Sequence, residues 1–185
     1  MKKIYYLIPI VTILLALGVF ALYQKFSLSN KNVPQTETSE RVGDVDVNVN
    51  LVAGFAIFTN TTPRIFSQPM YLNQSRDVYI QSENPNIVHV KKKDVSWDDF
   101  FKTLPFELTK TCLTTGTKQT FCGGQGGSLK FYLNGVLTPD FLSREIQNGD
   151  RLLITFGNEN ESEIQNQLNQ VPDPNNFLFL EVDPD

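Results

Sequence analysis

The chain has 185 residues, 41% of them hydrophobic, and a formal net charge of −4 at pH 7. Lys2, Lys3 and Lys25 place +3 on the first 25 residues, which leaves −7 on the remainder. A domain with this charge lacks the basic face that neutralises phosphates, so the composition argues against a nucleic-acid-binding protein.

An uncharged apolar run extends from Ile4 to Tyr23 and is followed by Gln24 and Lys25. About 20 helical residues span about 30 Å, which is the thickness of the hydrocarbon core of a bilayer. Residues 1–25 are therefore predicted to form a transmembrane signal-anchor. The sequence Val19-Phe20-Ala21 is a passable cleavage site, so removal of the segment as a signal peptide stays open.

Residues 26–48 are rich in Ser, Asn, Thr, Gln and charged residues and show no apolar periodicity. Such a segment buries too little surface to offset its ordering entropy, and it is predicted to be a linker. The folded domain is expected over 49–158, which is enough chain for one core. Residues 159–185 are predicted to add a polar helix over 159–170 and an acidic, proline-containing tail with an apolar stretch at 177–180.

The first half of the domain contains three predicted strands. Residues 51–59 form an apolar run, with Gly54 as the candidate position of a β-bulge. Two short runs at 78–80 and 87–90 are separated by Asn84-Pro85-Asn86, a turn sequence that predicts a hairpin.

A short helix is predicted after Ser96, whose hydroxyl can accept a hydrogen bond from the amide of Asp99. The apolar residues that follow are spaced i, i+3, i+4 and i+7 and should pack on the sheet: Trp97, Phe100, Phe101 and Leu104. Pro105 is expected to end this helix.

The second half of the domain is predicted to be mainly strand, at residues 106–112, 129–133 and 151–156. Asn134-Gly135 predicts a type I′ turn. A glycine-rich loop is expected at Gly123, Gly124, Gln125, Gly126 and Gly127. One helix on one face of a mixed sheet is an α+β arrangement.

Cys112 and Cys122 are the only cysteines of the chain. An isolated pair in an exported domain is most often a disulfide, and two unrelated buried thiols are the alternative. Lysines flank both ends of the apolar run, so the charge rule for membrane orientation is nearly neutral. The cysteine pair therefore decides the expected orientation, with the N-terminus in the cytoplasm and the folded domain outside it.

The region 79–157, with the stretches IVHV…SWDDFF, TKTCL, KFYLNG and IQNGDRLLITFGNENESEIQNQL, resembles uncharacterised membrane-anchored extracytoplasmic proteins of candidate-phylum bacteria and some archaea. The ending LNG…NGDRLLI is also similar to the last strands of β-grasp (ubiquitin-like) domains. This similarity implies a β-grasp-like mixed sheet with one packed helix. Relatives often carry an H-x-H pair upstream of the position of His89, where this chain has Ile80 and Ser82, and a metal role is therefore not expected.

No catalytic, cofactor-binding or metal-binding residue is predicted. His89 is the only histidine, lies on a strand opposite to Val88 and Val90, and is expected to be structural or at the surface. The loop 123–127 lacks the Gly-Lys-Ser/Thr and the helix of a phosphate-binding loop, and no G-x-S-x-G motif is present. Caps, turns and solvated faces account for the acidic residues Asp98, Asp99, Asp150, Glu159 and Glu161.

These observations favour a non-catalytic binding module at the cell surface that contacts another envelope or surface protein. The disulfide hairpin with its glycine-rich loop and the sheet edges are the expected contact surfaces. One alternative is a structural subunit of an envelope assembly, with 177–180 as its apolar contact. A hydrolase or metal-dependent enzyme is the other alternative, and the single histidine argues against it. Glycan-acceptor sequences begin at Asn60, Asn73 and Asn160, and the sequence leaves their modification open.

Overall fold

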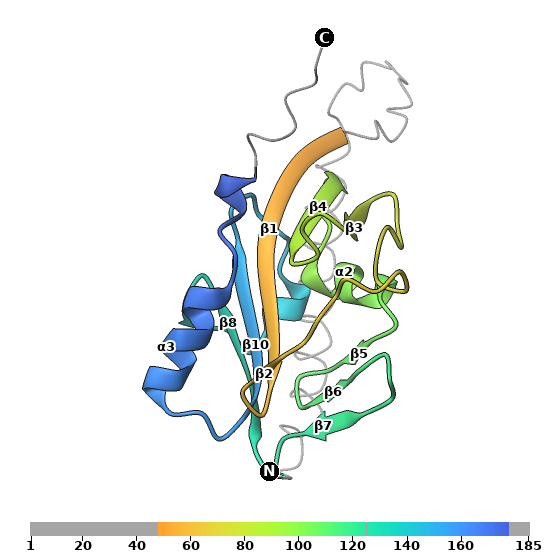
Figure 1. The fold of residues 1–185 in the computed structure, drawn as a ribbon. Coiled ribbons are helices and arrows are strands. Elements are labelled where there is room, and N and C mark those ends of the chain that lie inside the picture. Colours follow the sequence, from red (N-terminus) through yellow and green to blue (C-terminus); the bar gives the residue numbers. More distant parts are fainter. Residues whose placement is uncertain (1–47, 125, 178–185) are drawn as a thin grey trace, which may run out of the picture. The chain divides into compact units, whose positions relative to one another are not determined.

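The computed structural model describes residues 48–124 and 126–177. A mixed β-sheet carries an α-helix on each face, and a small three-stranded sheet lies beside it (Figure 1). The predicted α+β class is confirmed. The signal-anchor predicted at 1–25 lies outside the described residues, as does the predicted linker except for its last residue. None of the helices within 48–124 and 126–177 is long and apolar enough to cross a membrane.

The large sheet has the strand order β3-β4-β1-β10-β8-β9, with β2 paired to β1. Only β1 and β10 are parallel neighbours in the described sheet, and the remaining pairs are antiparallel. The strands are β1 (Asn48–Thr59), β2 (Thr62–Pro63), β3 (Val78–Ile80), β4 (Ile87–Lys92), β8 (Ser128–Leu133), β9 (Val136–Leu137) and β10 (Arg151–Gly157). The small sheet consists of β5 (Glu107–Leu108), β6 (Cys112–Thr114) and β7 (Thr120–Cys122).

Two α-helices, α2 (Trp97–Thr103) and α3 (Glu161–Gln170), begin with a capping box. The amide of Asp99 donates to the hydroxyl of Ser96 at 3.1 Å, which confirms the predicted cap. At α3, the amide of Glu163 donates to the side chain of Asn160 at 3.0 Å, a cap that was not expected. Two short 3₁₀ turns complete the elements, η1 (Phe141–Ser143) and η2 (Pro174–Asn176).

One face of the large sheet forms an aromatic core with α2. The Phe55 ring centroid lies 4.9 Å from that of Phe66 and 5.4 Å from that of Phe100. The predicted apolar face of the helix is confirmed, since all four of its members are buried: Trp97, Phe100, Phe101 and Leu104. Burial of large aromatic side chains supplies much of the apolar stabilisation of a domain of this size.

The opposite face packs against α3, and the expectation of a single packed helix is therefore wrong. Alternate residues of β1 and β10, including Ala56, Phe58 and Leu153, form a second buried cluster with Ile164 and Leu168. The period-2 alternation of a strand sends neighbouring residues to opposite faces, so apolar residues at successive positions require cover on both sides.

Three local predictions differ from the structure. The strand predicted at 106–112 is interrupted after Leu108, because the hydroxyl of Thr109 accepts from the amides of Thr111 and Cys112, at 3.3 and 2.9 Å, and turns the backbone. β1 begins at Asn48, the last residue of the predicted linker. The shift in register between β1 and β4 lies between Asn48 and Leu51, and not at Gly54.

Two turn predictions are confirmed. The β3–β4 hairpin closes through a hydrogen bond from the amide of Ile87 to the carbonyl of Asn84 at 2.9 Å. The turn between β8 and β9 has φ of 53° at Asn134 and 80° at Gly135, the positive pair that a type I′ turn requires.

Gly54 is needed for a close approach between β1 and the chain that follows α3. A Cβ atom at this position would overlap the backbone carbonyl of Pro172. The absence of a side chain therefore allows the segment after α3 to lie directly on the sheet.

We expect the substitution Gly54→Ala to lower the free energy of unfolding by about 1–3 kcal/mol, the usual effect of overpacking. Gly123→Ala is the matched control, because a Cβ there meets its nearest atom, the carbonyl oxygen of Thr111, at 3.7 Å. Denaturant unfolding of the two variants and the parent checks this. Equal midpoints for the two variants would contradict the close approach.

Candidate functional site

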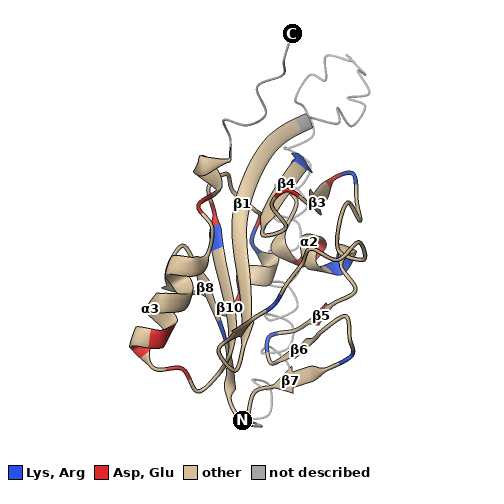
Figure 2. Cartoon of the chain, viewed as in Figure 1, with Lys and Arg blue, Asp and Glu red and all other residues tan. Residues whose placement is uncertain are grey.

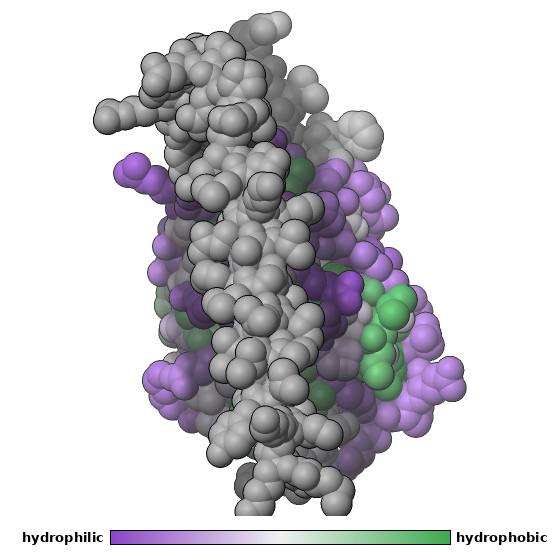
Figure 3. All heavy atoms as spheres, turned by 180° about the vertical axis from the view of Figure 1, so that it is seen from behind, coloured by the Kyte–Doolittle hydropathy of each residue, from purple (hydrophilic) through white to green (hydrophobic). Residues whose placement is uncertain are grey.

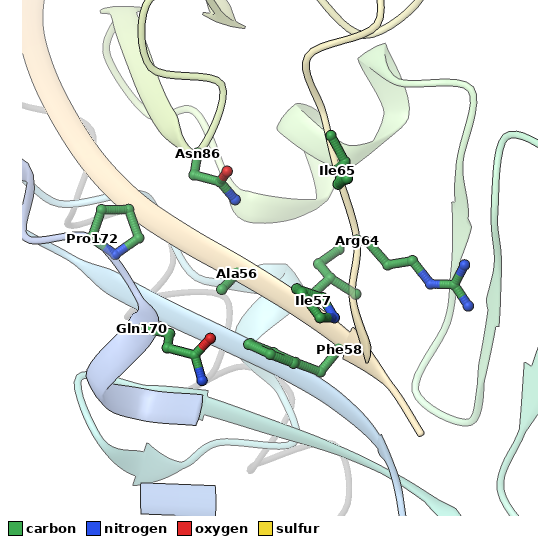
Figure 4. A pocket seen from close by; sticks show the side chains of 9 residues that line it. Ala56, Ile57, Phe58, Arg64, Ile65, Asn86, Gln170 and Pro172 are labelled. Carbon is green, nitrogen blue, oxygen red and sulfur yellow. The ribbon is translucent and has the colours of Figure 1, made fainter. Parts of the chain in front are cut away.

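Two hollows lie on either side of the segment that follows β2. The first has a volume of about 360 Å³ and is lined by residues of β1, by Asn86, by Gln170 at the end of α3 and by Pro172 after it (Figure 4). The second has a volume of about 300 Å³ and lies between this segment and the small sheet. Both are lined by Pro63, Arg64 and Ile65, which we call the 63–65 ridge.

The ridge is formed by the tight return of the chain after β1. Asn60 and Thr61 have φ values of 50° and 65°, and this turn brings β2 back beside the end of β1. The amide of Arg64 then donates to the carbonyl of Ile57 at 2.8 Å. Because β10 occupies the other side of these β1 residues, the ridge continues the sheet edge on the side of β4.

The ridge and its surroundings expose large hydrophobic side chains. Ile65 is 72% exposed and Met70, which lines the second hollow, is 44% exposed. Phe66, next to Ile65 in the chain, is only 1% exposed and belongs to the aromatic core. The core thus holds the backbone of the ridge in place, while Ile65 projects outward between the two hollows.

Arg64 is the only charged residue that lines either hollow, and no acidic residue lines them. Its guanidinium lies over the ring of Phe121, 5.0 Å from the centroid, and donates to the hydroxyl of Thr59. In Figure 4 the guanidinium points away from Ala56 and Pro172. The surface formed by the ridge and the two hollows therefore carries one positive charge, that of Arg64. This charge lies on the side of the ridge that faces away from the first hollow.

The predicted cysteine pair is confirmed. Cys112 and Cys122 lie opposite each other on β6 and β7 with a Cα–Cα distance of 4.1 Å and form a disulfide. Leu113, which is fully buried, and the largely buried Phe121 anchor this hairpin to the domain. The turn of the same hairpin supplies Thr115 and Thr117 to the second hollow, so the disulfide holds one wall of the site.

The glycine-rich loop lies away from the two hollows. The amide of Gly124 donates to the carbonyl of Gly127 at 3.0 Å, and the carbonyl of Gly126 accepts from the side chain of Asn158 at 3.2 Å. A Cβ at Gly127 would lie 2.8 Å from the Cα of Gly157. Gln125 is outside the described residues, and Gly123 completes the loop. The loop thus packs on the end of β10, and its predicted role in interaction remains a prediction.

A buried ion pair lies under the start of α3. The Nζ of Lys130 is 3.0 Å from Oε2 of Glu159, and the side chain of Glu159 is 1% exposed. The prediction that caps, turns and solvated faces account for all the acidic residues is therefore wrong for Glu159. Burial by itself raises the pKa of Glu159, but the hydrogen bond and charge of Lys130, with further hydrogen bonds, outweigh burial and hold this pKa below its ordinary value.

The remaining predicted acids have local roles. Asp150 is a buried turn residue. Its carboxylate accepts hydrogen bonds from the side chain of Asn134 at 2.8 Å and from the backbone amide of Gln147 at 2.9 Å. Asp98 pairs with Lys102 on the exposed face of α2. Hydrogen bonds from Ser96 lower the pKa of Asp99, in agreement with its capping role. Glu161 is exposed in the first turn of α3.

His89 has a structural environment, as expected. Its ring stacks on that of Tyr79 with a centroid distance of 5.3 Å, while Val88 and Val90 face the aromatic core. Within 48–124 and 126–177, no group of three or more His, Cys, Asp and Glu side chains is arranged to hold a metal ion.

Other surfaces of the described domain are less distinctive. Lys, Arg, Asp and Glu are scattered over several elements (Figure 2). Seen from behind, the part of the described surface that grey atoms leave visible is mainly hydrophilic, and its most prominent hydrophobic area lies at the right of the view (Figure 3). Val136 and Leu137 on the edge strand β9 are exposed by 66% and 56%, but neither lines a described hollow of the site.

Comparison of the chain with protein-family models, with curated proteins and with solved structures finds no match.

The Lys130–Glu159 pair predicts a specific pH dependence. The folded-state pKa of Glu159 is lower than its ordinary value of 4.5, so the pair stabilises the fold above that pH. This stabilisation is lost as the pH falls through the folded-state pKa. We expect Glu159→Gln to be less stable than the parent at pH 7, with a difference that shrinks below about pH 4.

Denaturant unfolding at a series of pH values from about 3 to about 7 measures this difference, because the stabilisation is present at the upper value and declines toward the lower one. Glu161→Gln is the control, since Glu161 is close in sequence but exposed, in the first turn of α3. A stability difference for Glu159→Gln that does not change with pH would show that the ion pair does not stabilise the fold.

Proposed function

We propose that this protein is a membrane-anchored, extracytoplasmic interaction module whose 63–65 ridge binds an extended segment of another envelope or surface protein. The observation that carries the proposal is Ile65, which is 72% exposed between two hollows of about 360 and 300 Å³. A large apolar side chain held outward beside concave surfaces is typical of a contact that a partner covers.

The chemistry of the ridge supports binding over catalysis. Acid–base catalysis needs a group that gains and loses a proton near the operating pH. Neither hollow is lined by a His, Cys, Lys, Asp or Glu side chain, and the one charged side chain among the lining residues is Arg64, which is engaged by Thr59 and Phe121. An arginine does not lose its proton in this range, and it is suited to hold a carboxylate of a partner.

The β-grasp-like assignment is part of the proposal. It is supported by the closing strand β10, which follows the turn at 148–150 and lies between β1 and β8. α2 packs across one face of that sheet, as the similarity implies. The small sheet and α3 are additions to such a core, and they supply walls of the two hollows.

The membrane and extracytoplasmic location rest on two observations. The uncharged run from Ile4 to Tyr23 has the length of a bilayer span. The disulfide between Cys112 and Cys122 is of the kind that persists in oxidising compartments.

The location predicts the redox state of the cysteines in cells. When the full chain is alkylated in intact membranes without reductant, we expect Cys112 and Cys122 to stay unlabelled, and both to be labelled after reduction. Mass spectrometry of the isolated chain measures the label. Two free thiols before reduction would contradict the extracytoplasmic location.

The binding role predicts a charge-sensitive peptide site at the ridge. Peptides selected by display on the full chain should be enriched in sequences that place acidic residues beside apolar ones, to match Arg64 and the hollows. We expect Ile65→Asp to weaken their binding by about tenfold or more, because it removes an apolar contact at the centre of the face.

Val136→Asp is the matched control, since Val136 is also an exposed β-branched residue but lies on β9. Titration of a fluorescent selected peptide gives the dissociation constants. Equal weakening by the two substitutions, or no effect of either, would argue against the ridge as the binding surface.

A further inference from the structure

We infer that the segment bound by the 63–65 ridge carries an aromatic side chain, which enters the second hollow, and a carboxylate two residues away from it, which pairs with Arg64. The inference rests on the proposed function, because it names the chemistry of the partner that the ridge would bind. It is carried by the lining of the second hollow and by the surroundings of Arg64, all of which belong to the described residues.

The second hollow has an aromatic inner surface. Three buried rings line it, with centroids 5.2, 5.7 and 6.2 Å apart: Phe66, Tyr71 and Phe106. The first hollow is lined by one ring, that of Phe58, among aliphatic and amide side chains. Aromatic rings pack favourably against other rings in edge-to-face or offset contacts, so the second hollow suits the ring of a partner.

Met70 adds to this preference for a ring. Its side chain is 44% exposed and lines the second hollow together with Tyr71. A methionine thioether packs favourably against aromatic rings and adapts to the shape of its neighbour. A Cβ at Gly116 would lie 2.7 Å from the hydroxyl oxygen of Tyr71 and 3.0 Å from the methyl carbon of Met70, so this glycine lets the turn of the disulfide hairpin lie against both.

The size of the second hollow fits one side chain of a peptide. Its volume of about 300 Å³ lies at the lower end of the range for pockets that enclose small molecules. Ile65, which is 72% exposed and also lines the hollow, would contact the neighbouring part of the same peptide. The hollow is therefore suited to a single anchoring ring.

Arg64 brings an unpaired positive charge to the same hollow. Its side chain is half-buried, and no carboxylate within 48–124 and 126–177 forms an ion pair with it. A guanidinium has several N–H donors, and the hydrogen bond to Thr59 uses one of them. The contact with the ring of Phe121 holds the group in place. A carboxylate matches such a planar donor group in both charge and geometry.

The spacing of the two groups follows from the geometry of an extended chain. Arg64 and the three rings line one hollow, so the partner's ring and carboxylate must project from the same side of the bound segment. Side chains on one side of an extended chain are two residues apart, or about 7 Å. The expected sequence is therefore an aromatic residue with Asp or Glu two positions before or after it.

The test begins with the peptides selected by display on the full chain. We expect them to share an aromatic residue and an acidic residue two positions from it. Replacement of the aromatic residue by alanine should weaken binding by about tenfold or more, because one anchor in a pocket carries much of the binding energy of such a contact. Titration of fluorescent synthetic peptides gives the dissociation constants.

A variant of the chain locates the ring. Met70→Ala should weaken binding of the aromatic peptide severalfold and should have little effect on the peptide that has alanine in place of the ring. Leu137→Ala is the matched control, since Leu137 is 56% exposed on β9 and lines neither hollow. It should leave the affinity of both peptides unchanged.

A second pair of measurements tests the carboxylate. Arg64→Gln should weaken binding of the acidic peptide severalfold and should not change the affinity of the peptide with Asn or Gln at the acidic position. Arg64→Lys should retain part of the binding, because it keeps the charge but loses the planar donor group. Circular dichroism checks that both variants are folded.

The outcomes separate this inference from the proposed function. Selected peptides that are weakened by Ile65→Asp but share no aromatic residue would overturn the inference and keep the ridge as a binding surface. The same holds if the ring is insensitive to Met70→Ala, or if the acidic residue is insensitive to Arg64→Gln. If no selected peptide is weakened by Ile65→Asp, both proposals fail.

Discussion

The structure depends on the burial of β1 on both faces and along both edges. Its residues from Val52 to Thr59 are all buried. Successive side chains point to opposite faces of the sheet, so that Phe55 and Ile57 pack on the side of α2 and Ala56 and Phe58 on the side of α3. β10 pairs with Gly54–Thr59 on one edge, while on the other edge β4 pairs along the first half of β1, as far as Gly54, and β2 pairs only with Phe58 and Thr59. The pairing with β4 ends at Gly54 and the pairing with β2 begins at Phe58, so a gap remains along this edge of β1. The site lies at this gap.

The gap is held open by hydrogen bonds that leave no backbone group of Phe55 unsatisfied. The amide of Phe55 donates to the carbonyl of Asn86 at 2.9 Å, and the side chain of Asn86 donates back to the carbonyl of Phe55 at 3.0 Å. A buried strand that lacks a neighbouring strand destabilises the fold by the cost of each backbone polar group left without a hydrogen bond. Asn86 replaces the missing strand here, and it also lines the first hollow.

Local sequence patterns predicted local structure well, but they did not predict which residues form the site. The Ser96 cap and the apolar spacing of α2 are confirmed because a cap and an amphipathic face are encoded within nine neighbouring residues, 96–104. Ile65 and Phe66 show the limit of such patterns, since the local sequence does not say which of the two side chains is buried. Contacts of Phe66 with Phe55 and Phe106, which are distant in the sequence, decide this. The same holds for Glu159, whose partner Lys130 is 29 residues away and whose burial requires Gly157.

Charges that are buried or half-buried place α3, and α3 in turn places the first hollow. Glu159, directly before the cap of α3, is fixed by Lys130 on β8. At the other end, the guanidinium of Arg151 on β10 donates to the carbonyls of Leu168 and Val171, at 3.1 and 2.5 Å. A cation at the carboxyl end of a helix and an ion pair at its start favour one position of the helix on the sheet. Because Gln170, the last residue of α3, and Pro172, just after it, line the first hollow, the position of α3 on the sheet sets one wall of this hollow.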